Sequence, residues 1–180
     1  ILMMYNYKIP IMKKILTTLL LGLTFFGFES CAQKKEKTEF NTEAFSEKLI
    51  TVEGKKITFD EVLKKHNGKT TVIEVWASWC GDCVKNMPKL KELQAANPTV
   101  DFVFLSCDKT QEKWQAGIAK HELQGDQYLI PDGMKGTFGK ALDLDWIPRY
   151  IIVDKTGKVA LYRAIETDHE KIQTTLNTLK

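Results

Sequence analysis

Four runs of apolar residues along the chain have the length and composition of β-strands. Residues 70–77 are β-branched or apolar except for one glutamate, and residues 100–106 are mostly apolar. Runs of this kind are typical of central strands that are covered on both faces. Residues 149–153 and 159–164 predict two further strands, because the turn-forming residues 154–157 separate them.

Apolar residues at helical spacing occupy the stretches between these strands. Residues 81–96 place Leu90 and Leu93 on one face, with Pro88 inside the expected helix. A shorter helix that Asp60 can cap is expected to end near Asn67-Gly68. The predicted helices other than 81–96 cover residues 60–65, 110–120, 134–142 and 168–179.

A predicted hairpin opens the folded part, with strands at 49–52 and 56–59 and its turn at Gly54. Residues 128–130 predict a short additional strand. After the first hairpin the order is βαβα, followed by a second hairpin and a final helix. This order predicts an α/β fold in which parallel strands with crossover helices are joined by antiparallel ones.

The amino-terminal region has the pattern of a signal segment. Lys13 and Lys14 precede an uncharged apolar run, residues 15–28, which Glu29 ends. The run is shorter than the roughly 20 residues of a membrane-spanning helix. An anchor that is never removed is the alternative interpretation.

Cys31 follows this segment and resembles the lipid-attachment cysteine of bacterial lipoproteins. Ser30 fits that pattern, whereas Phe28 and Glu29 depart from it, so a chance cysteine beside an ordinary cleavage site stays open. Acyl chains on Cys31 would hold the protein at a membrane surface. The expected organisation is a signal segment at 1–30, a polar tether at 31–44 and a folded domain at 45–180.

Composition is that of one globular domain with a tail. Of the 180 residues, 43% are hydrophobic and 27% are charged, which is enough for a core without disulfide staples. The formal net charge is only +3, and much of the excess lysine lies near the amino end. Nucleic acid is therefore not an expected partner.

The four cysteines include one closely spaced pair, Cys80 and Cys83. Cys80 lies where a strand feeds a helix, so unpaired N–H groups and the helix dipole favour its thiolate. Cys83 follows one helical turn later and can attack Cys80 to release a bound substrate. Cys107, at the end of a predicted buried strand, is expected to be a buried and inert thiol.

Zinc binding and a structural disulfide are the alternatives for this pair. A structural zinc site needs four ligands, but the other cysteines are isolated and His66, His121 and His169 are scattered. We therefore expect no metal. A disulfide that closes so short a loop restrains little of the unfolded chain.

The segment from Val72 to Cys83, followed by Pro88, resembles the active-site segment of thioredoxins. With the signal segment and the preceding hairpin, it is most similar to the membrane-tethered TlpA/ResA-like branch, over about residues 45–180. The resemblance implies a thioredoxin-like fold, a central mixed β-sheet flanked by helices with an N-terminal β-hairpin extension. It also implies a thiol–disulfide oxidoreductase that needs no cofactor.

The resemblance also assigns roles to residues around the dithiol. Glu74 would be a buried acid that takes the proton of Cys83, unless it is a solvated glutamate on an edge strand. Pro88 would kink its helix, unless that helix ends early. Ile147-Pro148 would be a cis peptide facing the dithiol, with Trp146 and Arg149 beside the groove, although Trp146 equally fits ordinary packing. The expected substrate-binding residues are Trp79, Gly81, Asp82, Ile147 and Pro148.

Two positions depart from the family pattern. Asp82 replaces the usual proline between the cysteines, and its charge is expected to raise the pKa of Cys80 and favour a reductant. Asn86 stands where the branch often carries an acid, so the role of that acid is absent here.

The function expected from these features is reduction of disulfides in exported proteins by the Cys80–Cys83 dithiol. By resemblance, a membrane thiol–disulfide interchange protein supplies the electrons, and the protein is a lipoprotein on the periplasmic side of the bacterial envelope. A thiol oxidant or isomerase of the same fold and a non-catalytic binding or chaperone module are the alternatives. A peroxidase is a further one, but its Pro-x-x-x-Thr/Ser-x-x-Cys arrangement is missing.

Overall fold

The computed structural model describes residues 36–180, and Glu36–Lys180 form one compact unit. The predicted signal segment, Cys31 and the first part of the tether lie outside the described residues. Within residues 36–180, no helix is both long and apolar enough to cross a membrane.

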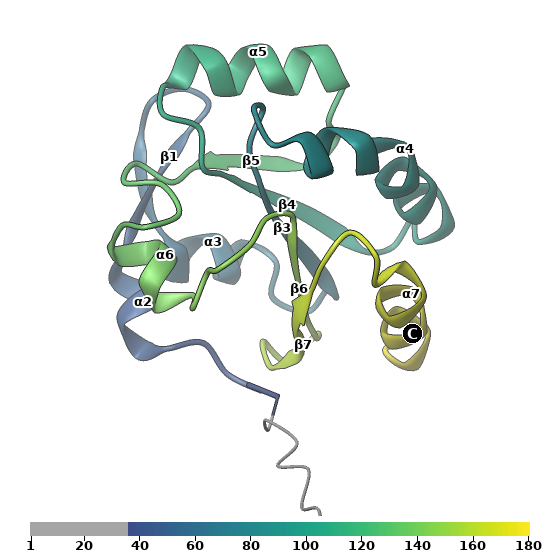
Figure 1. The fold of residues 1–180 in the computed structure, drawn as a ribbon. Coiled ribbons are helices and arrows are strands. Elements are labelled where there is room, and N and C mark those ends of the chain that lie inside the picture. Colours follow the sequence, from purple (N-terminus) through teal and green to yellow (C-terminus); the bar gives the residue numbers. More distant parts are fainter. Residues whose placement is uncertain (1–35) are drawn as a thin grey trace, which may run out of the picture. The chain divides into compact units, whose positions relative to one another are not determined.

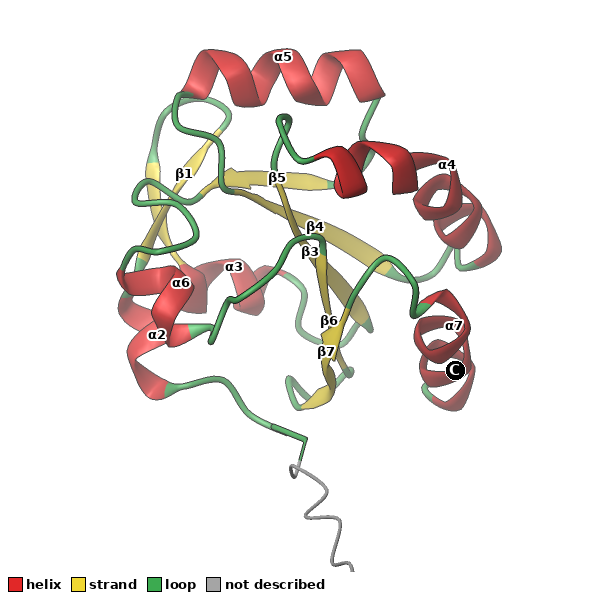
Figure 2. Cartoon of the chain, viewed as in Figure 1, coloured by secondary structure: helices red, strands yellow, loops and turns green. Residues whose placement is uncertain are grey.

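A mixed seven-stranded sheet lies at the centre of this unit (Figure 2). The strand order is β2-β1-β5-β4-β3-β6-β7. β3, β4 and β5 are parallel, whereas β6 and β7 on one side and β1 and β2 on the other pair antiparallel. The strands are β1 (Lys48–Thr51), β2 (Lys56–Thr58), β3 (Thr71–Trp76), β4 (Asp101–Ser106), β5 (Asp126–Leu129), β6 (Arg149–Val153) and β7 (Val159–Ala164).

Helices cover both faces of the sheet. In Figure 1, α4 and α7 lie side by side on one face, and α2, α3 and α6 gather on the other. The helices are α2 (Thr42–Ser46), α3 (Phe59–Lys65), α4 (Gly81–Ala96), α5 (Gln111–His121), α6 (Thr137–Ala141) and α7 (His169–Thr178). This arrangement confirms the expected thioredoxin-like fold with its amino-terminal hairpin.

The position of β3 explains its composition. It pairs with β4 on one side and β6 on the other, and all six of its residues are buried. Helices on both faces leave no solvated side for polar residues, so apolar and β-branched side chains fill the strand. β3 thus delivers the chain that follows it, which contains both cysteines, to the carboxyl edge of the parallel strands.

The amino-terminal part of the fold differs from the expectation in two respects. The N-cap of α3 is Thr58, which forms a capping box with Glu61, whereas Asp60 lies inside the helix. The folded part also begins ahead of residue 45. Phe40, expected in the tether, is 7% exposed and packs edge-on against Phe59 at 5.0 Å between ring centroids, and Asn41 caps α2.

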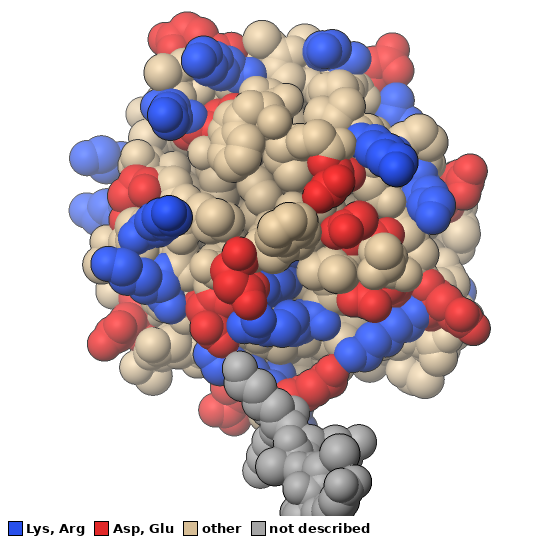
Figure 3. Space-filling model, in the orientation of Figure 1, with Lys and Arg blue, Asp and Glu red and all other residues tan. Residues whose placement is uncertain are grey.

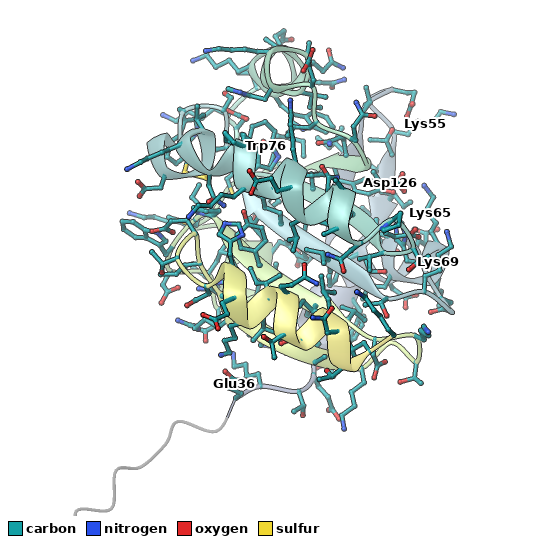
Figure 4. All side chains as sticks on the ribbon, turned by 90° about the vertical axis from the view of Figure 1, so that its right-hand side faces the viewer. Glu36, Lys55, Lys65, Lys69, Trp76 and Asp126 are labelled. Atoms are coloured by element: carbon teal, nitrogen blue, oxygen red, sulfur yellow. A yellow bond between two sulfur atoms is a disulfide. The ribbon has the colours of Figure 1, made fainter. Side chains whose placement is uncertain are left out.

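On the face that Figure 3 shows, Lys and Arg side chains are interspersed with Asp and Glu side chains rather than gathered by sign. Near the amino ends of β4 and β5, Asp101 accepts one hydrogen bond from Lys69 at 3.0 Å and pairs with His66 at 2.8 Å. Lys65 and Asp126 lie 3.8 Å apart. Figure 4 shows Lys65, Lys69 and Asp126 along one edge of the molecule, away from Trp76, which ends β3 on the side that leads to the cysteines.

Candidate active site

Cys80 and Cys83 lie at the amino end of α4 and are joined by a disulfide. Cys80 is the N-cap residue, and the backbone N–H of Cys83 donates to its Sγ at 3.1 Å. The two Cα atoms are 5.3 Å apart, a separation that a disulfide spans without backbone movement. The helix terminus and this N–H would also stabilise a thiolate on Cys80 after reduction.

The two cysteine residues differ in their exposure to solvent. Cys80 is 6% exposed and Cys83 is 1% exposed. Trp79, directly before Cys80, is 58% exposed, and Gly81 and Asp82 are exposed as well. Of the two cysteines, Cys80 is therefore the one with exposed neighbours that a partner can reach.

The loop before β6 faces Cys80. The Ile147-Pro148 peptide is cis, as the resemblance predicts. The carbonyl oxygen of Ile147 lies 3.6 Å from Cys80 Sγ. Trp146 is 50% exposed, so it is a surface residue and not part of the core.

Arg149 does not flank an open groove, contrary to the expectation. It is completely buried, and its guanidinium pairs with Asp145 and reaches the backbone oxygen of Asp143. Arg163 binds the same two aspartates. Buried charge needs such partners, so Arg149 belongs to an ion cluster that holds the loop before Ile147.

Glu74 is a buried acid on a central strand, and the edge-strand alternative is wrong. It is 1% exposed, and burial raises its pKa to about 8. Neither carboxyl oxygen accepts a hydrogen bond of normal geometry. The hydroxyl of Tyr150, on the residue opposite Glu74 in β6, opposes part of this rise in pKa.

Asn86 takes part in a polar contact that sequence reasoning missed. Its side-chain N–H donates to the Tyr150 hydroxyl at 2.8 Å, and its Oδ1 lies 2.8 Å from Nε2 of His169. Asn86 is 6% exposed and lies one helical turn after Cys83, so the two share a buried face of α4. The sequence had singled out Asn86 only as a departure from the family pattern and gave no sign of these two partners.

Asp108 is a second residue that the sequence did not single out. It is 2% exposed and accepts hydrogen bonds from the backbone N–H of Ser78 at 3.0 Å and from its hydroxyl at 2.7 Å. The Ser106 hydroxyl donates to it at 2.9 Å. Asp108 therefore ties the segment before Cys80 to the end of β4.

The remaining predicted features take ordinary places. Pro88 lies inside α4, so that helix does not end early. Cys107 is 4% exposed and burial raises its pKa to about 12, as expected for an inert thiol. Among residues 36–180, no three His, Cys, Asp or Glu side chains converge as metal ligands would.

Comparison with known proteins places this geometry in a family context. Residues 36–179 match the Redoxin family. The chain is 28% identical over 137 residues to the thiol-disulfide oxidoreductase ResA of Bacillus cereus, covering 75% of each protein. It is 31% identical over 129 residues to ResA of Bacillus thuringiensis, covering 69% of each.

Solved structures agree in fold. A solution structure of a Bacteroides vulgatus protein assigned to the thiol-disulfide oxidoreductases is 32% identical and has a TM-score of 0.61, with 76% of this chain and 88% of that one covered. A secreted disulfide oxidoreductase of Mycobacterium tuberculosis, 20% identical with a TM-score of 0.60, covers 77% of this chain and 99% of its own. The latter shows the fold alone.

Proposed function

Since the chain belongs to the Redoxin family and is a thiol–disulfide oxidoreductase of its TlpA/ResA-like branch, we propose that it reduces disulfides in exported proteins. Cys80 is the attacking sulfur and Cys83 the resolving one. The observation that carries this assignment is the bonded pair at the start of α4, in which Cys80 is the more exposed residue.

The first step uses the reduced protein. The Cys80 thiolate attacks one sulfur of the substrate disulfide, a bond forms between the two sulfurs, and the second substrate sulfur leaves as a thiolate. The Cys83 N–H at 3.1 Å supports the negative charge on Cys80. The exposed residues beside Cys80 let a polypeptide reach it.

The second step releases the substrate. Cys83 loses its proton to Glu74 and attacks Cys80 Sγ, which forms the Cys80–Cys83 disulfide and expels the remaining substrate thiolate. Two electrons have then passed from the dithiol to the substrate. Because Cys83 is 1% exposed, water is a poor acceptor for its proton, and a buried carboxylate with a pKa of about 8 suits the role.

Substrate contacts come from both sides of Cys80. Trp79, Gly81 and Asp82 form the exposed rim before and after it, and Ile147 and Pro148 form the facing wall. The Ile147 carbonyl, 3.6 Å from Cys80 Sγ, is placed to accept a backbone N–H from an extended substrate. Trp79 and Trp146 add exposed apolar surface for side chains of any sequence.

Export and anchoring form a separate part of the proposal. Residues 1–30 direct export, Cys31 carries the lipid, and a membrane thiol–disulfide interchange protein returns electrons to Cys80–Cys83. The support is the sequence pattern at the amino end together with the family. Incorporation of labelled fatty acid should be lost in Cys31→Ser, and equal labelling of both proteins would refute the anchor.

Reduction of insulin disulfides tests the activity itself. With dithiothreitol as electron source, the wild-type protein should accelerate insulin precipitation, and Cys80→Ser should not. Cys107→Ser serves as a matched control and should behave as wild type, because Cys107 is a buried free thiol that takes no part in the disulfide. Equal activity of the wild type and Cys80→Ser would overturn the proposal.

A further inference from the structure

A line of polar side chains runs from the surface of α7 through α4 to the centre of the sheet. His169 Nε2 lies 2.8 Å from Asn86 Oδ1, and Asn86 Nδ2 lies 2.8 Å from the Tyr150 hydroxyl oxygen. Tyr150 is completely buried and stands opposite Glu74 in the β3–β6 register. The line therefore ends at the acid beneath the dithiol helix.

The chemistry of Asn86 fixes the direction of these hydrogen bonds. Its Nδ2 can only donate, so the Tyr150 oxygen is the acceptor in that bond. Its Oδ1 can only accept, so His169 Nε2 carries a proton. The hydroxyl proton of Tyr150 is consequently free to point away from Asn86.

Glu74 is the acceptor that lies opposite this hydroxyl group in the β3–β6 register. Directly opposed residues of an antiparallel pair project to the same face of the sheet. Both carboxyl oxygens of Glu74 are buried and lack a hydrogen-bond partner of normal geometry. The Tyr150 hydroxyl is the one side-chain donor that lowers the pKa of Glu74. A buried carboxylate without a donor would be costly.

We propose that Tyr150 is a positioning residue for the resolving step: its hydroxyl donates to the Glu74 carboxylate, and Asn86 and His169 hold that hydroxyl in direction. The inference rests on the role given to Glu74 in the proposed function. The proton of Cys83 passes to Glu74, the Cys83 sulfur bonds to Cys80 Sγ, and the substrate thiolate leaves. Tyr150 keeps its own proton throughout.

Other charged groups face this line and must be separated from it. Glu166 lies in the segment after β7, and its Oε2 is buried without a partner. Its negative charge contributes to the raised pKa of Tyr150. Lys89 and Glu92 of α4 and Asp168 before α7 face His169. Burial and Lys89 together lower the pKa of His169, which favours the neutral ring at pH 7.

Release of glutathione from Cys80 measures the resolving step. The reduced protein is mixed with oxidised glutathione, and release from the Cys80 mixed disulfide is followed by rapid quench between pH 5 and 10. The logarithm of the wild-type release rate, plotted against pH, should rise and then level off at the pKa of Glu74. This change of slope is called the bend below. Tyr150→Phe removes the donor to the carboxylate, so the bend should move upward by about one pH unit.

Glu74→Gln separates a positioning role from a structural one. This variant should lose the bend, and adding Tyr150→Phe to it should change nothing further. A Tyr150→Phe profile that bends at the wild-type pH would overturn the inference. So would a Tyr150→Phe effect of equal size in the Glu74→Gln background, since it would then not act through Glu74.

Neighbouring variants complete the test. Asn86→Leu should move the bend in the same direction as Tyr150→Phe and gives an independent reading if that variant folds poorly. His169→Gln, which retains a donor, should keep the wild-type bend better than His169→Leu. Glu166→Gln is the control and should keep the wild-type bend. If its bend shifts as far as that of Tyr150→Phe, the Tyr150 hydroxyl donates to Glu166 and not to Glu74, and the inference is overturned.

Failure of the underlying function has its own signature. If no variant, including the wild type, releases glutathione, the dithiol assignment is wrong. If Glu74→Gln retains the wild-type bend, the role of Glu74 is wrong and the inference about Tyr150 falls with it. Only a bend that depends on Glu74 but not on Tyr150 contradicts the inference alone.

Discussion

Single residues set the protonation chemistry of the site. Glu74 is an acid inside a strand that is otherwise apolar, and burial raises its pKa to about 8. Cys107, by contrast, is a thiol whose raised pKa of about 12 removes it from redox chemistry. The same physical effect, loss of water around a charge, thus makes one group useful and another inert.

The first prediction at this scale concerns stability against pH. In the unfolded chain Glu74 releases its proton near pH 4.5, but in the folded chain it retains the proton to about pH 8. Between these values the unfolded state binds fewer protons, so the free energy of unfolding should fall as pH rises. For the oxidised protein, the loss relative to Glu74→Gln should be on the order of 3 kcal/mol.

Urea unfolding of both oxidised proteins at pH 5 and pH 8 measures this difference. The comparison removes the contribution of the three histidines, which both proteins share. Equal changes in unfolding free energy for the two proteins would show that Glu74 does not keep its proton in the fold.

The second prediction concerns Asp82, the exposed residue between the cysteines. Its carboxylate disfavours a second negative charge on Cys80, which destabilises the reduced form. Asp82→Pro should therefore raise the reduction potential. Asp82→Asn should raise it as well, and it removes the charge without the backbone restriction that proline imposes. Because solvent screens Asp82, the accompanying fall in the pKa of Cys80 should be less than about one unit. An unchanged or lower potential in both variants would refute this role.

At the scale of elements, Asp108 joins the ends of β3 and β4 through Ser78 and Ser106. Asp108→Ala leaves the buried Ser106 hydroxyl and the part-buried Ser78 donors unpaired, and it should lower the free energy of unfolding by about 3 kcal/mol. Asp154→Ala is the matched control, because Asp154 also accepts three hydrogen bonds but does so in an exposed turn. Urea unfolding that gives equal losses for both variants would contradict a special role for Asp108.

The elements themselves were largely predictable from the sequence. β3 and β4 have the apolar composition of doubly covered strands, and α4 begins and ends where the pattern expects. α2 was missed, because its five residues show no helical period. The segment before it has the polar composition of a tether, but its residue Phe40 is buried in the core. Short helices of this kind depend on tertiary packing more than on local propensity.

At the scale of the whole molecule, the dithiol, Glu74 and the cis Ile147-Pro148 peptide were expected from the sequence and the family it resembles. The position of Tyr150 opposite Glu74 was not. It follows from the register in which β6 pairs with β3, and a register between strands so distant in sequence cannot be predicted from local pattern. The prediction that Arg149 flanks the groove was wrong for a related reason. Arg149 is buried because the loop before β6 brings Asp145 to it, and a tertiary contact of this kind cannot be predicted from local pattern.

The reduction potential of the Cys80–Cys83 couple tests the central claim most directly. It is measured by equilibrating the protein with thiol buffers of known potential and quantifying the oxidised fraction. A reductase predicts a value near or below about −270 mV, and Cys107→Ser should give the same value. A value near about −120 mV, the range of strong thiol oxidants, would contradict the account.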